Sequence, residues 1–98
     1  MNAREYLFSE INVERQMQDA LWGGPQNDDQ HSARDWVAIL CRHVGLSMDD
    51  GQIPVDSVRF RRQMVRVAAL AVAAIESIDR RYPREKVADH ISREGANL

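Results

Sequence analysis

The chain has 98 residues, which is enough for one domain and too few for two of ordinary size. Hydrophobic residues make up 44% of the chain and charged residues 29%, a balance that excludes disorder throughout its length. The formal net charge of −2 disfavours a dedicated nucleic-acid-binding protein. The longest apolar run, Val67 to Ile75, is too short to span a bilayer, and no apolar signal segment follows Met1. We therefore expect a cytoplasmic protein without membrane association.

The first predicted helix runs from about Ala3 to Trp22. An apolar stripe recurs along it at helical spacing and consists of Leu7, Ile11, Val13, Met17 and Leu21. The segment Gly23-Gly24-Pro25 ends the helix, because glycine permits a left-handed cap and proline cannot continue a helix. The residues that follow, up to His31, are polar and rich in turn formers, which predicts a loop.

The second predicted helix begins at Ala33, because Ser32 and Asp35 have the spacing of a capping box. It extends to about residue 48 and frays from Gly45 onward. The residues predicted for its buried face are Trp36, Val37, Leu40, Cys41 and Val44. Cys41 is the only cysteine, which excludes a disulfide within the chain, and its place in this apolar stripe predicts a small buried residue.

The third predicted helix spans residues 58–82, with Asp56 or Ser57 as its cap and Pro83 as its end. Apolar side chains cover most of its sides, and two shorter helices of the same chain bury only part of such a surface. We therefore expect a homo-oligomer, either a dimer or a tetramer. The residues expected between copies are Phe60, Met64, Ala68, Ala71, Val72 and Ile75.

Together these elements predict an all-α fold in which three helices form an antiparallel bundle. A single helical domain is expected over residues 1–82, followed by a weakly helical or mobile tail at 83–98. No catalytic signature stands out by its spacing alone, so candidate sites come from two polar clusters.

The first cluster, which we call the acidic cluster, consists of Asp28, Asp29, His31 and Asp35. Carboxylates and an imidazole this close in sequence suit a divalent metal such as magnesium. Their spacing matches neither an EF-hand nor a helical zinc site. In the alternative interpretation, Asp28 and Asp29 make turn hydrogen bonds and Asp35 caps the second helix.

The second cluster is a group of arginines near the start of the third helix, consisting of Arg59, Arg61, Arg62 and Arg66. No acidic residue lies between Val58 and Ile75, so this stretch would suit a phosphate, a nucleic-acid backbone or an acidic protein surface. Alternatively, these arginines pair across the bundle with Glu14, Asp19 or Asp56.

Several motifs give the chain a resemblance to a known group of proteins. They are Glu14-Arg15-x-x-Gln18-Asp19-x-x-Trp22-Gly23-Gly24-Pro25, Asp28-Asp29-x-His31, Asp35-Trp36 and the Ala-rich run from Val65 to Ser77. Over about Ser9 to Arg81 the chain resembles small phage and prophage proteins, which are similar in turn to the MazG-like all-α NTP pyrophosphohydrolases. The resemblance implies the fold of those enzymes and, for a phage protein, a place in the cytoplasm of a bacterial host.

In the MazG-like enzymes, carboxylates on two helices bind magnesium and a nucleoside triphosphate, and the metal activates water. The resemblance places the first carboxylate motif on Arg42, His43 and Leu46, and the second on Gln63 and Arg66. None of these residues is a carboxylate. The resemblance therefore implies a protein that has lost the catalysis of the family and requires no cofactor.

Three functions remain open. The first is a binding module in which Arg42, His43, Arg62 and Arg66 hold a nucleotide or another anion. The second is an interaction protein, such as a phage-encoded inhibitor of a host protein in a bacterial defence complex. The third is a nucleotide pyrophosphohydrolase that depends on a divalent metal, magnesium or manganese, and uses the acidic cluster.

Overall fold

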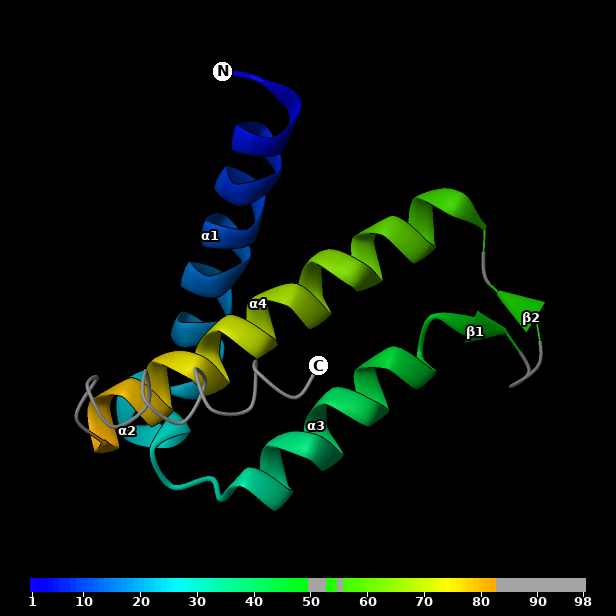
Figure 1. The fold of residues 1–98 in the computed structure, drawn as a ribbon. Helices are drawn as coiled ribbons and strands as arrows, with labels where there is room; N and C mark the ends of the chain where they lie inside the picture. Colours follow the sequence, from blue (N-terminus) through cyan, green and yellow to red (C-terminus); the bar gives the residue numbers. More distant parts are fainter. Residues whose placement is uncertain (50–52, 55, 83–98) are drawn as a thin grey trace, which may run out of the picture.

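The computed structural model describes residues 1–49, 53–54 and 56–82, so the predicted tail at 83–98 lies outside the described residues. The elements in chain order are α1 (Ala3–Trp22), α2 (Pro25–Asp28), α3 (Ala33–Gly45), β1 (Met48–Asp49), β2 (Ile53–Pro54) and α4 (Ser57–Arg81) (Figure 1). Apart from the pair of two-residue strands, every element is a helix, which confirms the predicted all-α fold. Within these described ranges, no helix combines the length and the apolar character that crossing a bilayer requires.

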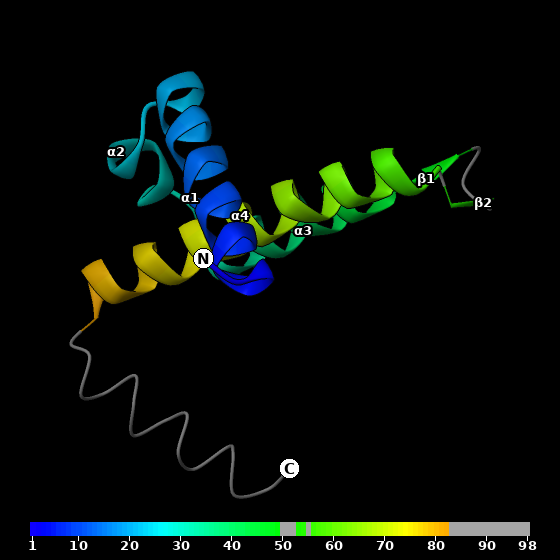
Figure 2. The same cartoon turned by 90° about the horizontal axis from the view of Figure 1, so that it is seen from above.

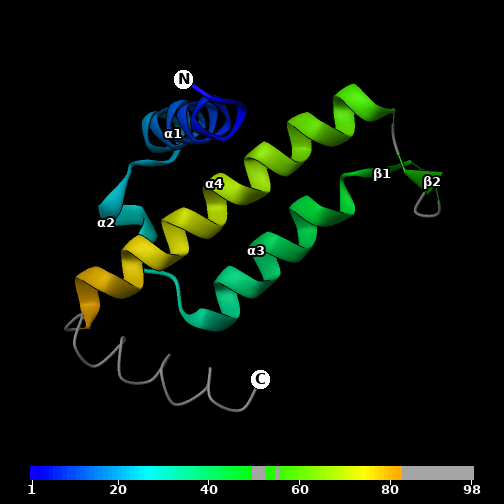
Figure 3. The ribbon, with the colours of Figure 1, turned by 45° about the horizontal axis from the view of Figure 1, so that its top comes forward.

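Helix α4 is the element against which the other helices pack. Helix α3 lies beside α4 and runs antiparallel to it, whereas α1 crosses α4 steeply (Figures 1 and 3). The view from above shows the same arrangement, with α3 running along α4 and α1 lying across it (Figure 2). The N-terminal halves of α1 and α4 diverge from their crossing, and this divergence positions one of the two hollows described below.

The caps predicted at Gly23, Ser32 and Asp56 are present, and α1 also begins with a cap, Asn2, that the sequence analysis did not predict. The Asn2 side chain accepts a hydrogen bond from the Glu5 amide (2.9 Å), and Gly23 ends α1 in a left-handed conformation with φ of 97°. Ser32 and Asp35 form the predicted capping box of α3. At the start of α4, the Asp56 carboxylate accepts from the Arg59 amide (3.0 Å).

The structure corrects the prediction for the segment after Gly24 and ends the second predicted helix where its fraying was expected to begin. The segment after Gly24 is not entirely a loop, because Pro25 begins the short helix α2. Proline is suited to the first position of a helix, since the backbone N–H that it lacks has no partner within the helix there. The helix predicted to reach about residue 48 ends at Gly45 instead. Beyond it, Met48 pairs with Pro54 and Asp49 with Ile53 in a small antiparallel ladder.

The apolar core of the described chain is small. Its buried hydrophobic residues are Trp36, Ala69, Leu70 and Ala73. The prediction of a fully buried face on α3 was wrong, because Val37, Cys41 and Val44 are exposed. Helix α3 packs chiefly on α4, so only the side of α3 that carries Trp36 is covered.

Candidate functional site

A buried arginine ties three helices together. Arg15 is only 9% exposed, and its guanidinium lies 2.8 Å from Asp19 Oδ1, 3.3 Å from Glu76 Oε1 and 3.6 Å from Asp28 Oδ2. It also donates a hydrogen bond to Gln18 Oε1 (3.2 Å). Because a buried charge is tolerated only when it is paired, these contacts fix α1 against α2 and α4.

Two buried amides continue this polar layer. Gln18 Nε2 donates to the backbone carbonyl of Arg66 (3.3 Å), across the α1–α4 contact. Gln63 Nε2 donates to the backbone carbonyl of His43 (2.9 Å) and lies 3.4 Å from His43 Nδ1, across the α3–α4 contact. Side-chain amides therefore hold both α1 and α3 on α4.

The structure gives the four residues of the acidic cluster separate partners. Asp29 accepts from Ser77 Oγ (2.8 Å) and from Arg80, whose Nη2 lies 2.7 Å from Asp29 Oδ1. Asp35 accepts from the Ser32 amide as part of its cap, and the His31 ring packs edge-on against Trp36 with centroids 4.9 Å apart. Among the described residues, no group of three His, Cys, Asp or Glu side chains is placed to hold a metal ion.

Asp28 and Asp29 are neighbours in electrostatically opposite surroundings. Burial raises the pKa of the Asp28 carboxyl above its ordinary value, and the nearby Arg15 only partly offsets this effect. Hydrogen bonds from Arg80 and Ser77 lower the pKa of Asp29. Folding thus shifts the pKa values of these two neighbouring carboxyls in opposite directions.

The arginines and the histidine expected to bind an anion are divided between two hollows. Arg62 and Arg66 line a cleft between α1 and α4, whereas Arg42 and His43 line a smaller cavity bounded by α1, α2, α3 and α4. Burial, followed by repulsion from Arg42 and Arg66, lowers the pKa of His43. His43 is therefore disposed to be neutral between these two positive charges.

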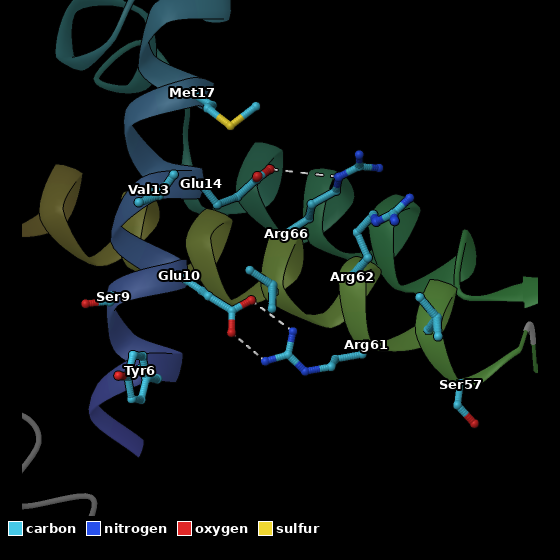
Figure 4. A pocket seen from close by; sticks show the side chains of 12 residues that line it. Tyr6, Ser9, Glu10, Val13, Glu14, Met17, Ser57, Arg61, Arg62 and Arg66 are labelled. Carbon is cyan, nitrogen blue, oxygen red and sulfur yellow. Dashed lines mark hydrogen bonds and ion pairs between the residues drawn. The ribbon is translucent and has the colours of Figure 1, made fainter. Parts of the chain in front are cut away.

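The first hollow, the α1/α4 cleft, has a volume of about 820 Å³ (Figure 4). Its apolar lining consists of Tyr6, Val13, Met17, Val58 and Val65. Around these residues, Arg61 makes a two-pronged contact with Glu10, at 2.6 and 2.9 Å, and Arg66 Nε lies 3.9 Å from Glu14 Oε1. The predicted alternative, in which these arginines pair with Glu14, Asp19 or Asp56, holds for Arg66, whereas Arg61 pairs with Glu10, which was not predicted.

The second hollow, the central cavity, has a volume of about 220 Å³. Many residues of the motifs that carry the MazG-like resemblance line this cavity: Arg15, Gln18, Asp19, Trp22, Asp28, His31 and Trp36. Sequence reasoning assigned no role to Arg15, Gln18 or Gln63. The available signal was spacing, since Arg15, Gln18 and Trp22 recur at intervals of three and four residues on one side of α1.

The residues expected between copies lie along α4 with unequal exposure. Phe60, Val72 and Ile75 are exposed, whereas Met64, Ala68 and Ala71 are half-buried. The exposed members are available for contact with another chain.

Compared with models of protein families, with curated proteins and with solved structures, the chain gives no match. The residues of the two hollows and the chemistry that they offer are therefore the basis for the function of this chain.

Proposed function

We propose that the protein acts by binding, and that its working form is a dimer in which a helix of a second copy occupies the α1/α4 cleft. The observation that carries this proposal is the exposure of large apolar side chains in and around that cleft. Tyr6, Val13, Met17 and Val58 line it, and each has more than half of its surface exposed. An exposed apolar surface of this kind is typical of a protein–protein contact.

The small core gives association a thermodynamic role. Burying a large apolar side chain contributes roughly 1.5–3 kcal/mol, and a chain of this length has few opportunities to do so alone. In the described part of the chain, Trp36 and Leu70 are the only large apolar residues that are buried. A second copy that covers the cleft would bury several more.

The charged residues around the cleft favour a second copy of the chain over a partner whose surface is only acidic or only basic. In a two-fold dimer each surface meets itself, so it must carry both halves of every complementary pair. The cleft meets this condition, with Glu10 and Glu14 on α1 and Arg61 and Arg66 on α4. Because these pairs already neutralise two of the arginines, the cleft suits a helix better than a free anion.

The resemblance to MazG-like proteins supports a binding role. His43 and Gln63, which the resemblance aligns with two metal-binding carboxylates, contact each other through an amide and an imidazole. We propose a MazG-like helical fold in which neutral contacts hold α3 and α4 together at this point. A phage origin and a host protein as the partner stay proposals of the same kind.

The proposal is tested by measuring the mass of the protein in solution by light scattering at micromolar concentration. We expect the mass of a dimer for the natural sequence and of a monomer for Met17→Glu, because a carboxylate on the cleft wall cannot be buried without a partner. The matched control is Val37→Glu, since Val37 on α3 is 61% exposed, close to the 55% of Met17, and lies outside the cleft.

Val37→Glu should keep the dimer. A monomeric natural protein would overturn the proposal and direct the search to a partner from a host. A Met17→Glu variant that stays dimeric would place the interface elsewhere, with the exposed residues of α4 around Ile75 as the next surface to change.

A further inference from the structure

The central cavity contains an unusual pair of atoms. In the described part of the chain, two buried side-chain polar atoms have no hydrogen-bond partner, Asp28 Oδ2 and Trp36 Nε1. Both residues line this cavity, although it is only one of several hollows. Asp28 is 7% exposed and Trp36 is 5% exposed, so bulk water does not reach either atom.

The two atoms have complementary requirements. Asp28 Oδ2 is a hydrogen-bond acceptor, and the nearest guanidinium nitrogen, Arg15 Nη2, lies 3.6 Å away without forming a hydrogen bond. Trp36 Nε1 carries a hydrogen that can only be donated. Buried polar groups in folded proteins are almost always hydrogen-bonded, so an acceptor held only by a 3.6 Å ion pair and an unbonded donor beside the same cavity suit a molecule that donates to the first and accepts from the second.

The remaining walls indicate what kind of molecule fits. Arg15 and Arg42 are balanced by Asp19 and Asp28, so the charged side chains of the lining sum to zero. Aromatic rings and aliphatic groups, including Trp22 and Leu70, make up much of the rest. A balanced, partly aromatic cavity favours a neutral planar molecule over an ion.

We propose that the central cavity binds a small neutral ring that carries an amide N–H beside a carbonyl oxygen. The ring donates its N–H to Asp28 Oδ2 and accepts from Trp36 Nε1 through its carbonyl. The size is suitable, because a cavity of about 150 Å³ holds benzene. This site is independent of the α1/α4 cleft and of the dimer.

The probe for this proposal is 2-pyridone, a neutral ring with the required N–H and carbonyl. Trp22 and Trp36 are the only tryptophans, so the NMR spectrum contains two indole N–H resonances, which Trp22→Phe assigns. On titration with 2-pyridone we expect a saturable downfield shift of the Trp36 resonance. N-methyl-2-pyridone keeps the carbonyl and lacks the N–H, and should bind at least tenfold more weakly.

A variant tests the same contact from the protein side. Trp36→Phe removes the open N–H donor and keeps an aromatic ring against His31, so the fold should persist, which a thermal melt verifies. Ligand-observed NMR should then show at least a tenfold loss of 2-pyridone binding. The proposal is overturned if the Trp36 resonance does not move, if the N-methyl compound binds equally well, or if folded Trp36→Phe binds like the natural protein.

Discussion

At the scale of single residues, the most informative contrast lies between Asp28 and Asp29. Both side chains belong to the acidic cluster, yet one is buried beside Arg15 and the other is paired with Arg80 and Ser77. Burial favours the neutral form of a carboxyl, and donated hydrogen bonds favour the ionised form. The two neighbours should therefore affect stability with opposite dependence on pH.

The first of these effects concerns Asp28. Its folded-state pKa lies above the ordinary value of 3.8, so its stabilising contribution is complete below that pH and is lost as the pH rises through the folded pKa. Asp28→Asn mimics the neutral form at every pH. We therefore expect the free energy of unfolding of this variant, relative to the natural protein, to increase between about pH 3 and about pH 7.

Asp29→Asn is the matched control, for which the relative stability should change with pH in the opposite direction. The folded pKa of Asp29 lies below 3.8, so its stabilising contribution is present above that value and is lost as the pH falls. The relative stability of Asp29→Asn should decrease over the same pH range. Urea denaturation at the two pH values measures the stability of both variants. If the relative stability of both variants changed equally between these pH values, the environments described for the two carboxyls would be contradicted.

The sequence predicted the residue types of the site better than their roles. Asp35 could be recognised as a cap because its partner, Ser32, is local, and the structure confirms this alternative. The partners of Asp29 could not be recognised, since Ser77 and Arg80 lie about fifty residues further along the chain. Local spacing identifies contacts within one element, whereas contacts between elements depend on how the helices pack.

At the scale of elements, two glycines test how the helices end. Gly24 precedes α2 with φ of 65° and ψ of −146°, a region that side chains disfavour, whereas Gly45 ends α3 with open space around its missing Cβ. Gly24→Ala should lower the free energy of unfolding by about 1–3 kcal/mol. Gly45→Ala should raise it by about 0.5 kcal/mol, because alanine restricts the unfolded chain and favours the helix.

Thermal or urea denaturation of the two variants measures this difference. A Gly24→Ala variant as stable as the natural protein would show that the turn between α1 and α2 has another conformation. A destabilised Gly45→Ala variant would show that the end of α3 has a close neighbour, in conflict with the open space around this residue.

The long helices were predictable because their signals are local. Asn2, Ser32 and Asp56 each cap a helix by bonding an amide three residues on. Helix α2 and the β1–β2 pair were missed, since four-residue helices and two-residue strands have no periodicity to detect.

At the scale of the whole molecule, the crossing of α1 over α4 decides which residues meet. The sequence grouped Arg42 and His43 with Arg62 and Arg66, but the structure directs the two pairs to different hollows. Helix crossing angles arise from the packing of side-chain ridges, and a periodic pattern in one helix does not specify them. The steep crossing leaves the first halves of α1 and α4 apart (Figure 1). The α1/α4 cleft is lined by side chains from these two segments.

The proposed dimer makes a last prediction about stability. If folding and association are coupled, a tenfold increase in protein concentration should raise the apparent free energy of unfolding by about 1.4 kcal/mol of dimer. Urea denaturation at two protein concentrations measures this shift. Met17→Glu should lose the concentration dependence and Val37→Glu should keep it, because Met17 alone of the two lines the cleft. If the midpoint of the natural protein does not change with concentration, one chain folds without a partner. The small core of the described residues and the buried polar layer around Arg15 would then be sufficient for stability.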